Sequence, residues 1–250
     1  MSSTTCIAVI LLSLLSGLTS LIGVVLAIYF KKSVKGITLG IGFSAGIMLL
    51  ISFFELVPES LTTAGSFKTL IAVALGVLLI AILNFIIPHT HFVKEKGKIK
   101  SSLLRTAYLV AFGLILHDFP EGFAMANSYI FAPSLGLLIA VSIALHNIPE
   151  EFAMAIPLVL AGKRKGFLFK VATLSALAEP AGAIIGLFAV HFLPTLNPLF
   201  MSFAAGAMIF ISVHELLPMA RRYKRIGLFI LGIALSVIVY WGLILLITSQ

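Results

Sequence analysis

Long apolar runs separated by short polar segments are the feature that most constrains this chain. Eight runs can be marked in its 250 residues, near 7–30, 37–57, 68–87, 106–126, 134–161, 167–190, 199–219 and 226–247. Each has roughly the 20 residues that a helix needs to cross a bilayer. Only 10% of the residues are charged and the mean hydropathy is +1.18. Because lipid cannot satisfy backbone polar groups, unbroken runs predict helices rather than barrel strands. We expect an all-α integral membrane protein, with residues 1–250 forming a single transmembrane domain.

The basic residues predict the orientation of this bundle. All but one of the 17 Lys and Arg residues lie in loops that follow the odd-numbered runs, and the exception is Lys68. Such loops face the cytoplasm, so both termini are expected on the extracellular or periplasmic side of the cell membrane. Topology also explains the net charge of +8 better than a nucleic-acid partner does. The apolar run that ends at Phe30 has no clear cleavage site, which favours a retained first span.

Two pairs of segments indicate internal repeats. The segments 43–58 (FSAGIMLLISFFELVP) and 203–218 (FAAGAMIFISVHELLP) share nine identities over 16 positions. The segments 116–126 (LHDFPEGFAMA) and 145–155 (LHNIPEEFAMA) share His, Pro and Glu at the same offsets. The loop charges predict that the members of each pair cross the membrane in opposite directions. An inverted 3+2+3 repeat follows, and such repeats are typical of transporters with a site near the membrane midplane.

The central pair of segments carries the residues with metal chemistry. His117 and Glu121 are four residues apart, as are His146 and Glu150, so each pair shares a helix face. For a lone buried histidine, a hydrogen-bonded core residue is the usual alternative. Two equal His/Glu pairs within lipid instead favour metal binding, because intramembrane ionisable groups are expensive unless they function. Glu121 and Glu150 are placed to bridge two adjacent cations.

Further donors are expected from the same depth of the membrane. Asp118 and Asn147 directly follow the two histidines and add oxygen atoms. Glu179 is a third oxygen donor, although pairing with a polar neighbour would also explain it. Met48 is the best-placed thioether, although methionine on a helix is usually core filler. Imidazole and carboxylate ligands suit Zn2+, Fe2+, Mn2+ or Co2+, and a thioether adds affinity for a soft ion such as Cd2+.

At these residues the chain resembles the ZIP family of metal transporters, particularly its prokaryotic GufA-like branch. The motifs are HDFPEG at 117–122, HNIPEE at 146–151 and AEPAG at 178–182, with support from FSAGIML and HELLP. The resemblance covers essentially the whole chain. It implies uptake of divalent metal into the cytoplasm by an elevator-like movement, through a binuclear site between the fourth and fifth spans. The implied ligands of one metal are Met48, His117, Glu121, His146 and Glu150, and those of the other are Asp118, Glu121, Asn147, Glu150 and Glu179.

Three positions depart from the family pattern. Asp118 stands where the fourth span often has Asn, Asn147 where some members have Asp, and Glu151 where Gly is frequent. Metal preference is therefore open. Candidates for the transport path are Glu55, Glu59, Glu151, His214, Glu215, His89 and His91. A helix end near water can also carry such groups without a transport function, and a solvated loop equally explains the PHTH segment at 88–91.

The leading hypothesis is a carrier without chemistry on the metal and without a catalytic cofactor. A metal-gated channel is one alternative, and an intramembrane metalloenzyme is another. The absence of an HExxH motif and the expected two-sided access both disfavour the enzyme. The expected partners are divalent metal ions and the lipid bilayer, with no nucleic acid, and a homodimer is compatible with this arrangement.

Overall fold

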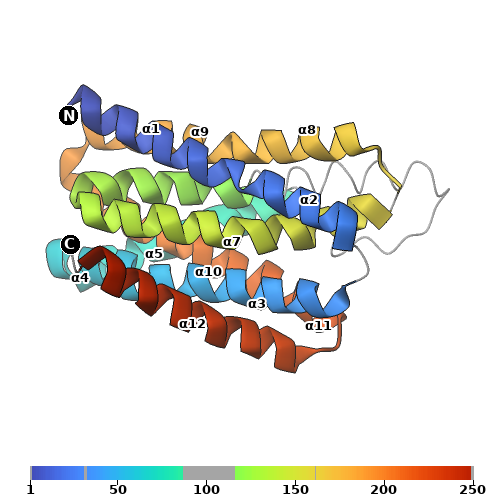
Figure 1. Ribbon diagram of the computed structural model, residues 1–250. Coiled ribbons are helices and arrows are strands. Elements are labelled where there is room, and N and C mark those ends of the chain that lie inside the picture. Colours follow the sequence, from blue (N-terminus) through green and yellow to red (C-terminus); the bar gives the residue numbers. More distant parts are fainter. Residues whose placement is uncertain (1, 31–32, 87–115, 161, 249–250) are drawn as a thin grey trace.

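The computed structural model describes residues 2–30, 33–86, 116–160 and 162–248, and within these ranges the chain is helical and has no strand (Figure 1). Seven segments of the described chain are long and apolar enough to cross a membrane. They are α1 (Ser3–Leu18) with α2 (Ser20–Phe30), α3 (Val34–Ile51) with α4 (Val57–Ala64), α5 (Ser66–Ile86), α7 (Pro133–Leu160), α8 (Lys165–Ala176) with α9 (Ala178–Phe192), α10 (Asn197–Ile211) with α11 (Leu217–Arg222), and α12 (Ile226–Thr248). A further helix is described over residues 116–131. The rest of the run expected at 106–126 lies outside the described residues. The expected all-helical class is confirmed.

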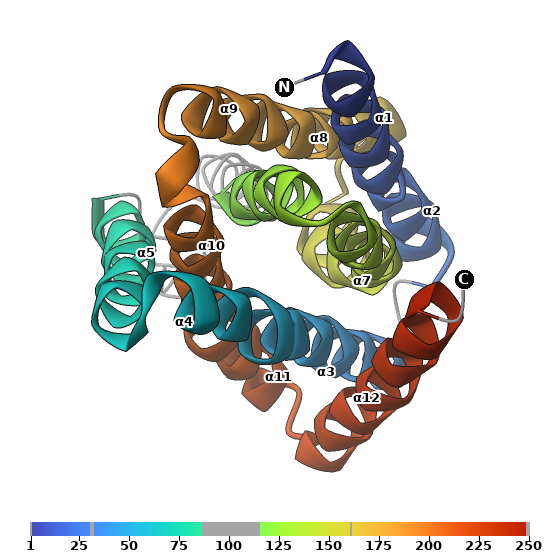
Figure 2. The same cartoon turned by 90° about the vertical axis from the view of Figure 1, so that its left-hand side faces the viewer.

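The helices run side by side as one elongated bundle whose chain ends lie at the same end (Figure 1). Seen from that end, the helix of residues 116–131 and α7 lie in the middle, while α5 and α12 lie at the periphery (Figure 2). Large apolar side chains on the two peripheral helices are exposed, among them Leu70, Phe85, Ile230 and Leu245. A surface of this kind suits lipid, where apolar side chains need no cover from other protein. The two peripheral helices therefore form part of the lipid-facing surface, whereas the helix of residues 116–131 and α7 are enclosed by the other helices (Figure 2).

Two of the membrane segments contain a π-helical turn. The turn η1 (Ser52–Leu56) joins α3 to α4, and the turn η4 (Ser212–Leu216) joins α10 to α11. Pro58 and Pro218 follow at the same distance from the two turns. A proline within a helix has no N–H to donate and its ring crowds the carbonyl four residues earlier. The wider turn accommodates this conflict, so each helix continues without ending.

Two other segments are interrupted near the middle. Thr19 separates α1 from α2, and Leu177 separates α8 from α9. At each break the cap residue keeps right-handed helical backbone angles, so the chain continues in the same general direction. α1 packs against both α7 and α9. The breaks place Ser16 of α1 and Ser175 of α8 beside polar residues of the two central helices.

Candidate metal site

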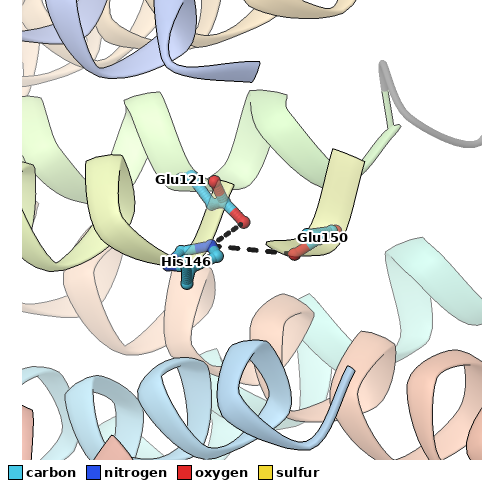
Figure 3. A group of neighbouring side chains, drawn as sticks. All are labelled: Glu121, His146 and Glu150. Carbon is cyan, nitrogen blue, oxygen red and sulfur yellow. Dashed lines mark hydrogen bonds and ion pairs between the residues drawn. The ribbon is translucent and has the colours of Figure 1, made fainter. Parts of the chain in front are cut away.

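Three buried side chains of the ligand type meet between the helix of residues 116–131 and α7 (Figure 3). Glu121 comes from the first helix, whereas His146 and Glu150 come from α7, and one donor atom of each lies within 4.8 Å of the others. Nε2 of His146 lies 3.1 Å from Oε1 of Glu121 and 3.8 Å from Oε2 of Glu150. The four-residue spacing puts His146 and Glu150 on one helix face. One imidazole nitrogen and two carboxylates therefore converge on one place, as in protein zinc sites.

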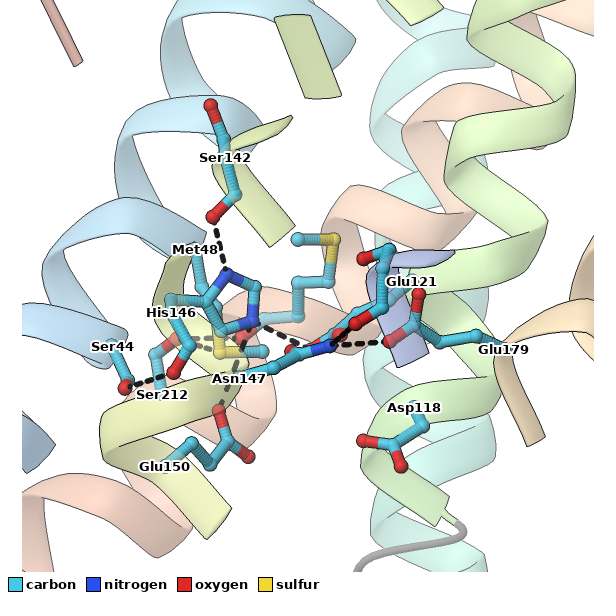
Figure 4. Close-up of polar contacts among 12 residues, drawn as sticks. Ser44, Met48, Asp118, Glu121, Ser142, His146, Asn147, Glu150, Glu179 and Ser212 are labelled. Carbon is cyan, nitrogen blue, oxygen red and sulfur yellow. Dashed lines mark hydrogen bonds and ion pairs between the residues drawn. The ribbon is translucent and has the colours of Figure 1, made fainter. Parts of the chain in front are cut away.

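The His146 ring is held in a definite orientation. Its Nδ1 lies 3.2 Å from the carbonyl oxygen of Ser142, one turn earlier in α7. A carbonyl only accepts, so this contact is a hydrogen bond when Nδ1 carries the proton. The His146 carbonyl in turn accepts a hydrogen bond of 3.0 Å from the Ser44 hydroxyl of α3 (Figure 4). These contacts direct Nε2 toward the two carboxylates, which is the arrangement in which a neutral imidazole binds metal.

Several carboxylate oxygens at this place lack a hydrogen-bond donor. Oε2 of Glu121, both carboxylate oxygens of Glu150 and Oε2 of Glu179 are buried and accept no hydrogen bond from the described residues. The ion pairs that Glu121 and Glu150 form in the described chain involve histidine rather than Lys or Arg. A buried carboxylate without a partner is costly. A divalent cation would satisfy these oxygens, so the residues present fit a metal ion.

Oxygen-bearing side chains form a second group on the α1, α8 and α9 side of the three residues. The Asn147 amide donates to Oε1 of Glu179 (Figure 4). The Ser175 hydroxyl donates to Oδ2 of Asp118. Asp118, Asn147, Ser175 and Glu179 are all buried. The side chains that the sequence predicts for a second metal position therefore lie in one polar cluster, although no ion is needed to explain their mutual hydrogen bonds.

Two other predicted ligands have different neighbours. Nε2 of His117 lies 3.4 Å from Oε2 of Glu215, in the π turn η4, and both side chains are buried. Sδ of Met48 is fully buried and lies 3.6 Å from the Ser212 hydroxyl of the same turn. These contacts link α3, η4 and the helix of residues 116–131. His117 and Met48 are thus not part of the three-residue group, and their ligand roles stay predictions.

Comparisons with known proteins agree with the chemistry of this cluster. A family model described as ZIP zinc transporter matches residues 89–247. A protein named zinc transporter ZupT from Streptococcus mutans is 38% identical over 242 residues, which cover 89% of this chain and 91% of that protein. Proteins of the same name from Corynebacterium aurimucosum and Chlorobaculum parvum are 40% and 39% identical, over 84% and 89% of this chain and 85% and 91% of their own lengths. The chain belongs to the ZIP zinc transporter family.

Membership decides between some of the alternatives. ZIP proteins are transporters and not enzymes, so the intramembrane metalloenzyme is set aside. The apolar helices together with the family make the chain a multi-pass protein of the cell membrane, which in a bacterium is the inner membrane. The resemblance that the motifs predict is confirmed, and so is transport as the activity.

The predicted path residues of this ZIP protein lie in different surroundings. Glu151 is buried in α7, and Glu59 is partly buried in α4. The half-buried Glu55 accepts a hydrogen bond from the hydroxyl of Tyr240 in α12. His214 is exposed and its ring packs edge-on against Phe210, with centroids 4.7 Å apart.

The loop histidines His89 and His91 lie outside the described residues.

Sequence reasoning missed the serines around the site of this ZIP protein. Ser142 orients His146, Ser175 donates to Asp118, and Ser16 lies beside Asn147. A signal for Ser16 exists in the sequence, because Ser13, Ser16 and Ser20 recur at helical spacing in the first apolar run. Small hydroxyl residues are common in membrane helices for packing alone, so this pattern does not by itself indicate a site.

Proposed function

We propose that this ZIP protein carries zinc into the cytoplasm through a two-metal site between the helix of residues 116–131 and α7. The observation that supports this most directly is the convergence of Glu121, His146 and Glu150 in the enclosed part of the bundle. A mixed nitrogen and oxygen ligand set suits zinc, and also iron, manganese, cobalt and cadmium. The relatives' printed name, zinc transporter, favours zinc among these ions. In this proposal the whole chain forms one transmembrane domain.

Two adjacent cations account for the number of buried carboxylates. Glu121 and Glu150 carry carboxylate oxygens that accept no hydrogen bond from the described residues. We propose that each binds both ions, which in two-metal sites commonly lie roughly 3.5–4 Å apart. The proposed ligands are Met48, His117, Glu121, His146 and Glu150 for the first position, and Asp118, Glu121, Asn147, Glu150 and Glu179 for the second.

We propose that the two similar segments belong to an inverted repeat, which supports transport by alternating access. In Figure 1, α3 and α10 run in opposite directions along the bundle, and each leads into a π turn at the matching place in the two similar segments. The Ser52 hydroxyl donates to the Met48 carbonyl at 2.7 Å, and the Ser212 hydroxyl to the Met208 carbonyl at 2.9 Å. Helices with the same local structure and opposite direction give a transporter two related halves, which expose one site to either side in turn. An elevator-like shift of the central helices is the movement we propose.

We propose inward transport from the family resemblance alone, whereas the basic loops give the orientation of the chain in the membrane. The loops that carry most of the Lys and Arg residues are proposed to face the cytoplasm, with both termini outside. Glu215 next to His117 extends the polar residues from the site toward that end of the bundle. We therefore assign Glu215 and the exposed His214 to the inner part of the path. Glu55 and Glu59 are assigned to its outer part, and Glu151 to the part beside Glu150.

Uptake of radioactive zinc into proteoliposomes tests this proposal. We expect saturable uptake by the wild-type protein, and loss of most of it in Glu121→Gln and in His146→Ala. His191→Ala is the matched control, because His191 is an exposed histidine at the end of α9, and its uptake should equal that of wild type. Undiminished uptake in both site variants would overturn the proposed site.

Carrier and channel are separated by the kinetics of the same preparation. A carrier must change conformation in each cycle, so its flux saturates with zinc concentration and depends steeply on temperature. A flux that rises linearly with concentration, with the weak temperature dependence of diffusion, would favour the metal-gated channel.

A further inference from the structure

The break between α1 and α2 lies against the central helix α7. The Thr19 hydroxyl lies 2.6 Å from the carbonyl oxygen of Ser16 and 2.9 Å from that of Ala144, and its proton is shared between these two acceptors. Ala144 precedes His146 by two residues. The last turn of α1 is thereby fixed beside the proposed metal site.

Close packing sets the position of Ser16 against α8 and α9. A Cβ atom on Gly17 would lie only 2.3 Å from the carbonyl oxygen of Ala176, so α1 and the end of α8 touch through their backbones. In the sequence, Ala176 directly follows Ser175, which donates to Asp118, and precedes Glu179 by three residues. Because neither backbone can move closer, the side chain of Ser16 has a fixed place beside these residues.

The amide of Asn147 is oriented by Ser16 and Glu179. Its nitrogen donates to the Ser16 carbonyl at 3.4 Å and to Oε1 of Glu179. Both partners accept only, so both amide hydrogens are used and the assignment of nitrogen and oxygen is fixed. The Asn147 oxygen is left as an acceptor that a cation can use.

The hydroxyl of Ser16 faces the Glu179 carboxylate. It is buried, with 2% of the residue exposed, and its hydrogen is directed at that carboxylate. The lone pairs of the hydroxyl oxygen accept no hydrogen bond from the described residues. This oxygen, like that of Asn147, is therefore an acceptor that a cation can use.

We propose that Ser16 of α1 supplies a hydroxyl oxygen to the second metal position, together with Asp118, Asn147 and Glu179. This position then has oxygen donors alone, whereas the nitrogen and sulfur candidates His117, His146 and Met48 belong to the first. Oxygen donors favour harder cations and thioether and imidazole favour softer ones. The two positions therefore differ in metal preference. The inference rests on the proposed two-metal site and adds a ligand from a helix that does not carry the His-x-x-Pro-Glu motif.

Replacing the hydroxyl by a thiol tests the position of this oxygen directly. In a Cys6→Ser background, Ser16→Cys places a sulfur of similar size where the hydroxyl lies. Titration with cadmium should then produce the ultraviolet charge-transfer absorption of a cadmium–thiolate bond. Ser13→Cys in the same background is the matched control, because Ser13 is also buried in α1 but donates to the Ile10 carbonyl one turn away from the site. It should give no such absorption.

A second variant tests the ligand role of Ser16 without introducing a new ligand. Ser16→Ala should weaken cadmium and manganese binding at one of two positions by about tenfold and leave the other unchanged, as measured by calorimetry. Absence of the absorption in Ser16→Cys, with cadmium still bound at wild-type stoichiometry, would overturn the role of Ser16 and leave the proposed function intact. A wild-type protein that binds no cadmium, zinc or manganese would overturn the two-metal site and the role of Ser16 together.

Discussion

Adding one methyl group at Gly122 should weaken the second metal position without removing any ligand. A Cβ atom at this residue would lie 1.9 Å from the backbone oxygen of Glu179. Such contacts do not occur below about 3 Å, so the two helices must separate by roughly 1.1 Å. The obstacle is backbone and cannot turn aside as a side chain would. Because Glu121 adjoins Gly122, we expect a shift of either helix to displace the Glu121 and Glu179 carboxylates relative to each other by up to a similar amount.

That displacement is large for a metal site. Ligand distances in such sites hold to within about 0.2 Å, and disturbing the groups that position ligands typically costs 10- to 100-fold in affinity. We expect Gly122→Ala to lower zinc affinity at the second position by this factor, which is about 1.4–2.8 kcal/mol. Overpacking adds a loss of stability of about 1–3 kcal/mol.

Two-site zinc titration by calorimetry, with a thermal unfolding curve for each variant, measures both effects. Gly227→Ala in α12 is the control, because a Cβ atom there meets nothing within 4 Å, and it should titrate like wild type. Wild-type affinity at both positions in a folded Gly122→Ala protein would refute the reasoning that this contact sets the ligand geometry.

Three further outcomes follow from single contacts. Tyr240→Phe removes the hydrogen bond to Glu55, and should lower the free energy of unfolding by about 1 kcal/mol. Zinc uptake should persist because the Glu55 carboxylate assigned to the path is retained; complete loss of uptake in a folded variant would contradict this and indicate that the hydrogen bond itself is required. The double exchange Asp118→Asn with Asn147→Asp keeps the number of carboxylates but removes the amide donor to Glu179. The metal-free variant should therefore melt at a lower temperature than the metal-free wild type. Zinc should raise the melting temperature of the variant more than that of the wild type. Met48→Leu keeps the volume and removes the sulfur, so cadmium affinity should fall about tenfold while manganese affinity stays the same; equal losses for both ions would contradict a thioether ligand.

The helical class and the residues of the central cluster are accessible from sequence because they depend on local rules. Apolar runs report the lipid surroundings, and a four-residue spacing places His146 and Glu150 on one face wherever the helix lies. The structure adds that Glu121 of the neighbouring helix faces the same point. The sequence suggests this pairing only through the likeness of the two segments.

Contacts between distant segments could not be read from the sequence. The pairing of Tyr240 with Glu55 depends on how α12 lies on α3, and that of Ser175 with Asp118 depends on where α8 ends. The matched residues Glu55 and Glu215 show the limit most clearly, because the similar segments predict similar roles. In the structure one accepts from a tyrosine and the other lies beside His117. Their surroundings differ although their local sequences agree.

The π turns determine which faces of the later half-helices point inward. A π turn holds one residue more than an α-helical turn, so every side chain beyond it is rotated by about 100° relative to an uninterrupted helix. A phase shift of this kind is set by chain length and not by residue type. Deleting one residue from η4 (Ser212–Leu216) would restore a regular helix and turn the following segment, while its sequence stayed the same. The number of residues in η1 and η4 therefore determines which helices α4 and α11 contact. An insertion or deletion in either turn should disturb this packing as much as the replacement of a side chain within it.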